Sequence, residues 1–318
     1  MKSVEEFKSF YDSVLTTELE PIEEQRKLYV AKTWHITFIW IGGLLAAAGL
    51  GLLLIYLAAL PIIGMIVMLV IHYKKRSVIG KYILTNFKKN VIEKTLHNIN
   101  DSLNFYPEKF MSQSTFAESK IFTNSGSRYK GDDYVTGTVG QTAISFSEIH
   151  AEDYTKDKDG KKQYYTIFKG VLFVADFHKN FAGETFVLTD TAEKMLGGLG
   201  KMFQKMNISR PELVKLENVT FEKQFVVYGT DQVEARYIIT PVLMETMLQL
   251  NENYKSVQFS FINSKIFITI PQKKNMFEPN YYSTLLNFDY LKEYYELLYY
   301  CISLVEILEL NNRIWTKE

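Results

Sequence analysis

The stretch TWHITFIWIGGLLAAAGLGLLLIYLAALPIIGMIVMLVIHY, from Thr33 to Tyr73, contains no Asp, Glu, Lys or Arg in 41 residues. As one helix it would be about 60 Å long. The hydrocarbon core of a bilayer is about 30 Å thick and is crossed by about 20 residues. The stretch therefore predicts a transmembrane helical hairpin, with spans near 33–51 and 54–73. A large buried hairpin of a soluble protein is the alternative.

The turn of this hairpin is expected near Leu53, just after Gly49 and Gly51. Pro61 either kinks the second helix or marks a later turn near Ala58–Pro61, since membrane helices tolerate proline when neighbours satisfy the freed carbonyl. Small residues also recur four apart. They either let two helices approach closely or reflect the general abundance of small residues in membrane helices. These pairs are Gly42/Ala46, Gly43/Ala47 and Ala47/Gly51.

Positive charge flanks the apolar stretch on both sides, and this charge favours the cytoplasmic face. The flanking residues are Arg26, Lys27 and Lys32 before it and Lys74, Lys75, Arg76 and Lys81 after it. We therefore expect a multi-pass protein of a bacterial cytoplasmic (inner) membrane, with both termini and the main domain in the cytoplasm. The acidic N-terminus, with Glu5 and Glu6, does not resemble a signal peptide. The single cysteine, Cys301, excludes an internal disulfide framework.

The basic residues Lys74, Lys75, Arg76 and Lys81 are candidate contacts for anionic lipid headgroups. Alternatively, these residues only set the orientation of the protein in the membrane. Over the whole chain, 36 basic residues balance 36 acidic ones, so composition gives no bias toward nucleic acid.

Amphipathic helices are expected on both sides of the hairpin. Apolar residues at helical spacing predict a helix over 3–20, and Pro21 is expected to open a second one. A further helix should run from the second span to about Leu103 and pack on the first; binding of both to the membrane surface is the alternative. The domain organisation expected is 1–32 amphipathic N-terminal helices, 33–73 transmembrane hairpin, 74–105 juxtamembrane basic helix and 106–318 cytoplasmic domain.

From Tyr106 the sequence consists of short β-rich runs, with a helix opened by Pro241 and a long apolar helix over 289–312. A short glycine-broken helix is expected within 188–206. Tyr154–Tyr164 reads as an exposed hairpin loop and Asn263-Ser264 as a tight turn. The fold class is therefore α+β: mostly antiparallel strands closed by the long C-terminal helix. A barrel-like arrangement that resembles pleckstrin-homology and tubby-like domains would satisfy this order of elements. Expected strands are 116–122, 132–140, 142–154, 164–177, 184–190, 212–217, 224–230, 235–240, 257–263 and 265–271.

Several segments together resemble one uncharacterised family of bacterial membrane proteins with two N-terminal spans. The segments are YKGDDYVTG (129–137), FSEIH (146–150), FKGVLFVADFHKNF (168–181), VKLE (214–217), FVVY (225–228), DQVEARYIITP (231–241), MFEP (276–279) and NRIW (312–315). The resemblance carries no assigned activity and no functional residue. It implies a membrane-associated process, because members of the family are often encoded near LemA-like membrane proteins.

Two groups of polar residues are candidate sites. Glu148/His150 and Asp176/His178 would each share a strand face. However, pairing of Tyr154 with Tyr164 would set His150 opposite Phe168 and Asp176 opposite Thr142, about 26 Å apart along the sheet, so no metal site is expected. The remaining histidines, serines and Gly197–Gly200 form no recognised site, and Asp132-Asp133 reads as a turn.

The second group combines carboxylates with an arginine. Its members could form an acid–base or anion site, or a structural ion-pair network, which we favour. These residues are Glu217, Asp231, Glu234 and Arg236.

No complete catalytic constellation is found in the sequence. The function expected is therefore that of a membrane-anchored, non-enzymatic protein whose cytoplasmic domain binds a partner protein or lipid headgroups. The alternative is a membrane-bound hydrolase or transferase that uses the acidic and Arg residues named above. No cofactor and no nucleic acid are expected; membrane lipids, a LemA-like membrane protein or a second copy of the chain are the expected partners.

Overall fold

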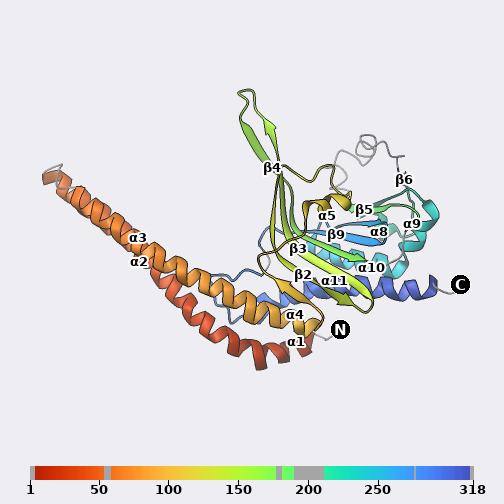
Figure 1. The fold of residues 1–318 in the computed structure, drawn as a ribbon, viewed down its shortest axis with the longest axis horizontal. Helices are drawn as coiled ribbons and strands as arrows, with labels where there is room; N and C mark the ends of the chain where they lie inside the picture. Colours follow the sequence, from red (N-terminus) through yellow and green to blue (C-terminus); the bar gives the residue numbers. More distant parts are fainter. Residues whose placement is uncertain (1–3, 54–58, 177–180, 190–210, 276, 316–318) are drawn as a thin grey trace. The chain divides into compact units, whose positions relative to one another are not determined.

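The protein is described from a computed structural model, which covers residues 4–53, 59–176, 181–189, 211–275 and 277–315 (Figure 1). The chain divides into two compact units. The first contains Met1–Asn98 and Phe277–Glu293, and the second contains Ile99–Met276 and Tyr294–Glu318. The return of Phe277–Glu293 to the N-terminal unit is not among the features that the sequence predicts. The domain boundaries expected after residues 32, 73 and 105 remain predictions.

The first unit is helical. Its elements are α1 (Val4–Phe10), the π-helical turn η1 (Tyr11–Leu15), α2 (Thr16–Leu53), α3 (Ala59–Asn86), the π-helical turn η3 (Phe87–Ile92) and α4 (Glu93–Ile99). The expected start of a new helix at Pro21 is wrong, because α2 runs through this residue without a break. Pro21 is exposed, and Ile22 beside it is buried. The apolar residues that follow thus continue the buried face of the same helix.

The helices that flank the apolar stretch pack on each other, as the sequence predicts. Phe7, Leu15 and Leu19 from the N-terminal side are buried, as are Phe87 and Val91 after α3. An ion pair between Lys94 and Glu18, with 2.5 Å between the charged atoms, adds a polar contact across the two segments.

Helices α2 and α3 lie side by side and run in opposite directions (Figure 1). Three contacts fix their register. The rings of His35 and His72 are 6.3 Å apart, Gly43 lies against Met65, and Tyr29 lies against Gly80. The turn that the sequence predicts near Leu53 stays a prediction, because residues 54–58 lie outside the described part of the chain.

One helix of the described residues, Val4–Leu52, is long and apolar enough to cross a membrane. No part of the most apolar window of this helix is buried against other described residues. Large apolar side chains of α3 are exposed as well. They include Ile62, Ile63, Ile66, Val67, Met68, Val70 and Ile71.

Gly43 is the point of closest approach between the two helices. A Cβ atom added there would lie 2.4 Å from Sδ of Met65 and 2.9 Å from its Cβ, whereas one added at the neighbouring Gly42 would meet nothing within 4 Å. The two glycines therefore differ in role although they are adjacent in sequence. Small residues at such contacts allow close helix packing in membranes.

We predict that Gly43→Val destabilises the protein by about 1–3 kcal/mol, because the added methyl groups overpack the contact with Met65. Gly42→Val is the matched control and should leave stability nearly unchanged. Thermal unfolding of both variants in mild detergent, followed by circular dichroism, measures the difference. Equal midpoints for the two variants would contradict the packing of α2 on α3.

The second unit is built on a nine-stranded sheet in the order β1-β2-β3-β4-β9-β8-β5-β7-β6, in which every neighbouring pair is antiparallel. The short helices α5 and α8 and the longer α9, α10 and α11 complete it. The strands are β1 (Asn104–Tyr106), β2 (Arg128–Val139), β3 (Thr142–Lys156), β4 (Lys162–Asp176), β5 (Thr185–Thr189), β6 (Glu212–Leu213), β7 (Phe225–Gly229), β8 (Gln258–Ile262) and β9 (Lys265–Pro271). The helices are α5 (Gln113–Glu118), α8 (Val219–Glu222), α9 (Gln232–Ile238), α10 (Pro241–Tyr254) and α11 (Phe288–Trp315).

The α+β class and the mostly antiparallel sheet are confirmed, but the barrel-like alternative is wrong. The sheet is open, and β1 and β6 form its two edges. The tight turn at Asn263-Ser264 is confirmed by the pairing of Ile262 with Lys265. The strand expected over 212–217 is shorter than predicted, and β1 was not predicted at all. The short helix expected within 188–206 falls mostly on residues outside the described part of the chain.

Two expected strands are helices instead. The segment 116–122 begins within α5, whose N-cap Ser112 accepts a hydrogen bond from the Thr115 amide at 3.2 Å. The segment 235–240 lies largely in α9, which begins after Asp231. In both cases a capping side chain satisfies amides of the first turn, and this outweighs the strand preference of the β-branched and aromatic residues nearby.

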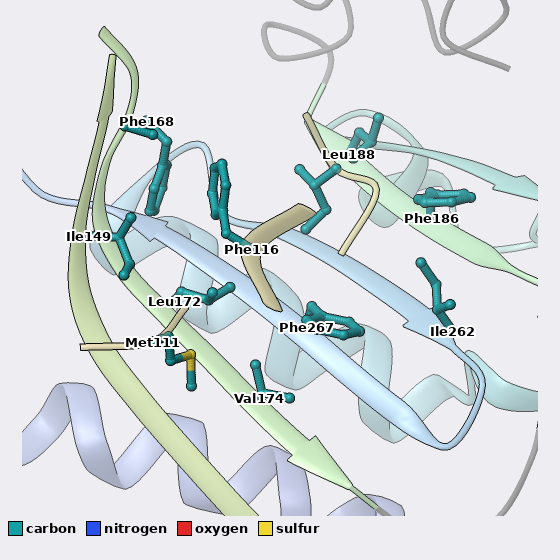
Figure 2. Close-up of a cluster of buried hydrophobic side chains, with 12 residues drawn as sticks. Met111, Phe116, Ile149, Phe168, Leu172, Val174, Phe186, Leu188, Ile262 and Phe267 are labelled. Atoms are coloured by element: carbon teal, nitrogen blue, oxygen red, sulfur yellow. The ribbon is translucent and has the colours of Figure 1, made fainter. Parts of the chain in front are cut away.

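Both faces of the central strands β5, β8 and β9 are buried. One face carries α10 and α11 (Figure 1), and the other holds a hydrophobic cluster into which α5 inserts Phe116 (Figure 2). Phe116 stacks on Phe168 with ring centroids 5.8 Å apart. Gly170 sits where β4 meets β9, and an added Cβ would lie 2.1 Å from the Ile270 carbonyl oxygen. The central strands therefore form a rigid platform for the loops around them.

Candidate functional site

A group of lysines lies at one end of the α2–α3 pair. It consists of Lys27 and Lys32 on α2 and Lys74, Lys75 and Lys81 on α3, and we call it the basic collar. The contact of Tyr29 with Gly80 sets these two helix segments at the same level. All five lysines are exposed except Lys32, which is half-buried. No Asp or Glu occurs from residue 25 to residue 92, although Glu23 just before this range interacts electrostatically with Lys27.

Arg76, expected from the sequence to contact lipid with these lysines, makes contacts within the protein. Its guanidinium lies over the ring of Tyr29, 4.6 Å from the centroid. It also donates hydrogen bonds to the hydroxyl oxygens of Tyr29 at 2.7 Å and Tyr282 at 3.2 Å. Arg76 therefore helps to hold the returning segment Phe277–Glu293 on the helices.

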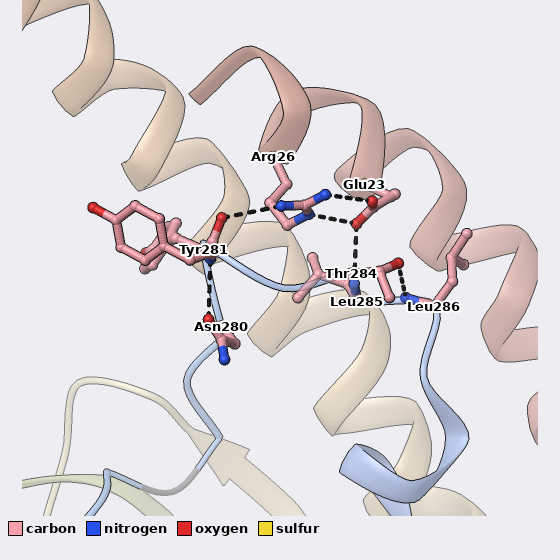
Figure 3. A network of polar contacts seen from close by, with 8 residues as sticks. Glu23, Arg26, Asn280, Tyr281, Thr284, Leu285 and Leu286 are labelled. Atoms are coloured by element: carbon pink, nitrogen blue, oxygen red, sulfur yellow. Dashed lines mark hydrogen bonds and ion pairs between the residues drawn. The ribbon is translucent and has the colours of Figure 1, made fainter. Parts of the chain in front are cut away.

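A buried ion pair holds the same segment more firmly (Figure 3). Arg26 donates two hydrogen bonds to the carboxylate of Glu23, each 2.7 Å long. The carboxylate also accepts the amide of Leu285 at 3.0 Å, and Arg26 donates to the carbonyl of Tyr281 at 3.2 Å. The side chains of Glu23 and Arg26 are only 5% and 12% exposed. The network therefore recognises the backbone of the returning segment rather than its side chains.

The charged forms of this pair are favoured. Burial alone would raise the pKa of Glu23, but hydrogen bonds from Arg26 and Leu285 and the charge of Arg26 outweigh it and lower the pKa. The hydrogen bond to Glu23 raises the pKa of Arg26. Because the folded-state pKa of Glu23 lies below its unfolded value, the pair contributes its full stability above the unfolded pKa. This contribution is lost as the pH falls through the folded-state pKa.

We predict that Arg26→Met destabilises the protein by about 3 kcal/mol at neutral pH, because it leaves a buried carboxylate without its counter-charge. The loss should shrink as the pH falls, because burial raises the pKa of Glu23 once Arg26 is gone and the carboxylate then takes up a proton. Lys89→Met is the control, since this lysine is exposed on η3 of the same unit and a surface substitution of this kind changes stability by about 0.5 kcal/mol or less. Thermal unfolding at several pH values measures both variants; equal losses would contradict the role of the network.

The acidic and Arg residues considered as an alternative site have structural contacts of their own. Asp231 accepts hydrogen bonds from the amides of Val233 at 2.8 Å and Glu234 at 2.9 Å, and so caps α9. The carboxylate of Glu234 accepts the amides of Ala182 at 2.7 Å and Gly183 at 2.6 Å. These carboxylates therefore fix a loop and a helix end.

The other two members of that set face outward. Arg236 is exposed and donates to the carbonyls of Lys215 at 3.3 Å and Gln232 at 3.0 Å. Glu217 is exposed in the segment between β6 and α8. A cavity of about 220 Å³ lies nearby, lined mostly by apolar residues that include Leu213 of β6, Val214 just after it and Phe225 of β7. None of the four residues lines it.

We predict that Asp231→Asn leaves stability unchanged, whereas Asp231→Ala lowers it by about 1 kcal/mol. Asn caps helices as well as Asp does, and Ala does not. Chemical denaturation of the three proteins checks this expectation. A loss as large for Asn as for Ala would show that the negative charge, and not the capping hydrogen bonds, is what the site needs.

The histidine-based metal hypothesis can be followed only in part, because His178 lies outside the described residues. Tyr154 pairs with Tyr164 as expected, but a bulge after Ala151 shifts the register. His150 therefore faces Lys169, and Asp176 faces Ala143. His150 lies 3.6 Å from Glu152, and burial lowers its pKa although Glu152 opposes this effect.

A different group of carboxylates was not anticipated. Oxygen atoms of Asp132, Asp133 and Glu148 lie within 4.8 Å of one another, a spacing at which they could share a cation. Asp132 and Asp133 lie in β2 at a bulge, not in the turn that the sequence predicts. Carboxylate oxygens suit hard cations such as Ca²⁺. Clusters of this kind are also common without an ion, so the group by itself defines no metal site.

Comparison with known proteins places a domain described as "Protein of unknown function (DUF3137)" over residues 166–310. The match begins within β4 and ends within α11, and its description gives no activity. No curated protein matches the chain. A solved structure of the mycobacterial trehalose monomycolate transport factor A matches with a TM-score of 0.31 and 7% identity, over 62% of this chain and 88% of that one. At that level of similarity it supports no conclusion about fold or function.

Proposed function

We propose that this protein is a membrane-anchored, non-enzymatic binding protein. The observation that carries this proposal is the pairing of two exposed apolar helices, α2 and α3, with the basic collar at one end. Exposed apolar surface of this extent is stable in lipid and not in water. In this proposal α2 and α3 cross a bacterial inner membrane as a hairpin, and both termini lie in the cytoplasm on the side of the collar.

The ligand proposed for the collar is the anionic headgroup layer. Lys74, Lys75 and Lys81 are exposed at the level where α3 leaves the apolar stretch, and each lysine near an anionic surface contributes about 1 kcal/mol of attraction. The sheet of the second unit would then present its loops and edges to a partner protein. A LemA-like membrane protein and a second copy of the chain are the proposed candidates for that partner.

The enzymatic alternative, a hydrolase or transferase that uses Glu217, Asp231, Glu234 and Arg236, has less support. Hydrogen bonds to backbone groups account for three of these side chains. Catalytic carboxylates are usually found in a cleft with other groups directed at the substrate, and the described contacts give no such arrangement.

We predict that reversing the collar, with Lys74→Glu, Lys75→Glu and Lys81→Glu, lowers the amount of anionic phospholipid that co-purifies with the full-length protein about tenfold or more. Mild detergent extraction from native membranes, followed by mass spectrometry of lipids and proteins, gives the measurement. The same charge change at exposed lysines of the second unit, Lys223, Lys273 and Lys274, is the control.

Two results would count against the proposal. Extraction of the protein from membranes by alkaline carbonate would show that α2 and α3 are not embedded. Equal lipid content in the collar and control variants would remove the role of the collar. A stoichiometric protein in the same preparation would identify the partner of the second unit.

A further inference from the structure

The β3–β4 hairpin extends well beyond the sheet (Figure 1). Its strands pair with each other as far as Lys156 and Lys162, but β2 stops pairing with β3 at Glu152, and β9 pairs with β4 only from Gly170 onward. Residues 153–165, which we call the ribbon, therefore have no strand on either edge among the described residues. At strand rise the four paired residues of each of its strands are about 13 Å long.

The ribbon is ordered by contacts of its own. The rings of Tyr154 and Tyr164 pair across the strands with centroids 5.7 Å apart. Arg128 lies over the ring of Tyr164 at 3.4 Å, and Lys162 lies over that of Tyr154 at 4.1 Å. Asp157 closes the turn by accepting the amides of Asp159 at 3.0 Å and Lys161 at 2.9 Å.

These contacts stabilise the ribbon without adding to the core of the sheet. A two-stranded hairpin is marginally stable in water, and none of the side chains from 153 to 165 is fully buried. The side chains of the ribbon therefore stay outside the core of the sheet and are available to contact another surface.

The charge at the tip points to an anionic surface. Lys156, Lys158, Lys161 and Lys162 are all exposed, and of the two acidic residues among them one, Asp157, is directed at backbone amides. Lysine carries a compact charge on a flexible stem, which suits a diffuse anionic layer better than the planar, bidentate recognition typical of arginine. The tip is therefore suited to a surface of many anionic groups.

Aromatic residues on the two strands that lead to the tip favour a lipid bilayer over other anionic surfaces. Tyr154, Tyr164 and Tyr165 are half-buried or exposed, and tyrosine favours the headgroup level of a bilayer, where its ring and hydroxyl meet apolar and polar surroundings. We propose that the ribbon binds anionic phospholipid headgroups as a second membrane contact of this protein. The inference rests on the proposed function, because the anchor keeps a bilayer at high effective concentration near the ribbon.

The test uses the full-length protein with an environment-sensitive dye on the ribbon. Gln163→Cys, an exposed and uncharged position, carries the dye in a Cys301→Ser background. The protein is reconstituted into vesicles of phosphatidylcholine alone or with added phosphatidylglycerol, each doped with a headgroup-linked quencher. We expect quenching only with phosphatidylglycerol, and its loss at high salt.

Charge reversal separates a specific contact from general attraction. Lys156→Glu, Lys158→Glu and Lys161→Glu should weaken the quenching about tenfold or more, while the pair of Lys162 with Tyr154 stays intact. Reversal of Lys223, Lys273 and Lys274 is the control and should leave quenching unchanged. Circular dichroism shows whether each variant is folded; for a triple variant that fails to fold, single reversals take its place.

Several outcomes would overturn the inference. They are a dye that is never quenched, quenching that is equal without phosphatidylglycerol, quenching that survives reversal of the tip, and contact of the ribbon with a protein in its place. Failure here is distinct from failure of the proposed function. An unquenched dye on a carbonate-resistant protein rejects only the ribbon contact, whereas carbonate extraction rejects the anchor itself.

Discussion

The charged pair of Glu23 and Arg26 imposes the main constraint on the first unit. Two charged groups that are almost excluded from water must pair with each other, and their remaining donors and acceptors must find hydrogen-bond partners. The last of these partners are backbone groups at Tyr281 and Leu285. The N-terminal helices are therefore completed by a segment that follows the entire sheet. Packing of Phe288 on Phe7 and Tyr11, with ring centroids 5.8 and 5.4 Å apart, strengthens the same attachment.

The sequence predicts those features that depend on local pattern. A run without charge defines the two apolar helices, and alternating apolar residues define the central strands and the hairpin between Tyr154 and Tyr164. Patterns fail where a single side chain decides the outcome. Ser112 and Asp231 cap helices in segments whose composition favours strands, and β1 has only three residues.

The candidate sites show the same division. The lysines of the collar can be recognised in the sequence as an excess of positive charge beside the apolar stretch. Most of them are exposed in the structure, as a surface contact requires. Arg76 cannot be told from them by sequence, because its partner Tyr282 lies 206 positions away. Likewise, nothing local marks Glu23 as the acceptor of an amide 262 residues later. Asp231 and Glu234 look like part of a charged site in the sequence. In the structure, both carboxylates accept hydrogen bonds from backbone amides instead.

The division of the first unit between the two ends of the chain also has a consequence for biosynthesis. Domains generally fold in order as the chain leaves the ribosome, but here the first unit lacks Phe277–Glu293 until every strand of the sheet has been made. Glu23 and Arg26 can pair at once, while the backbone groups they bind are still to be translated. In this order of synthesis all nine strands are made before the returning segment that completes the first unit, and the part of α11 that belongs to the second unit follows it.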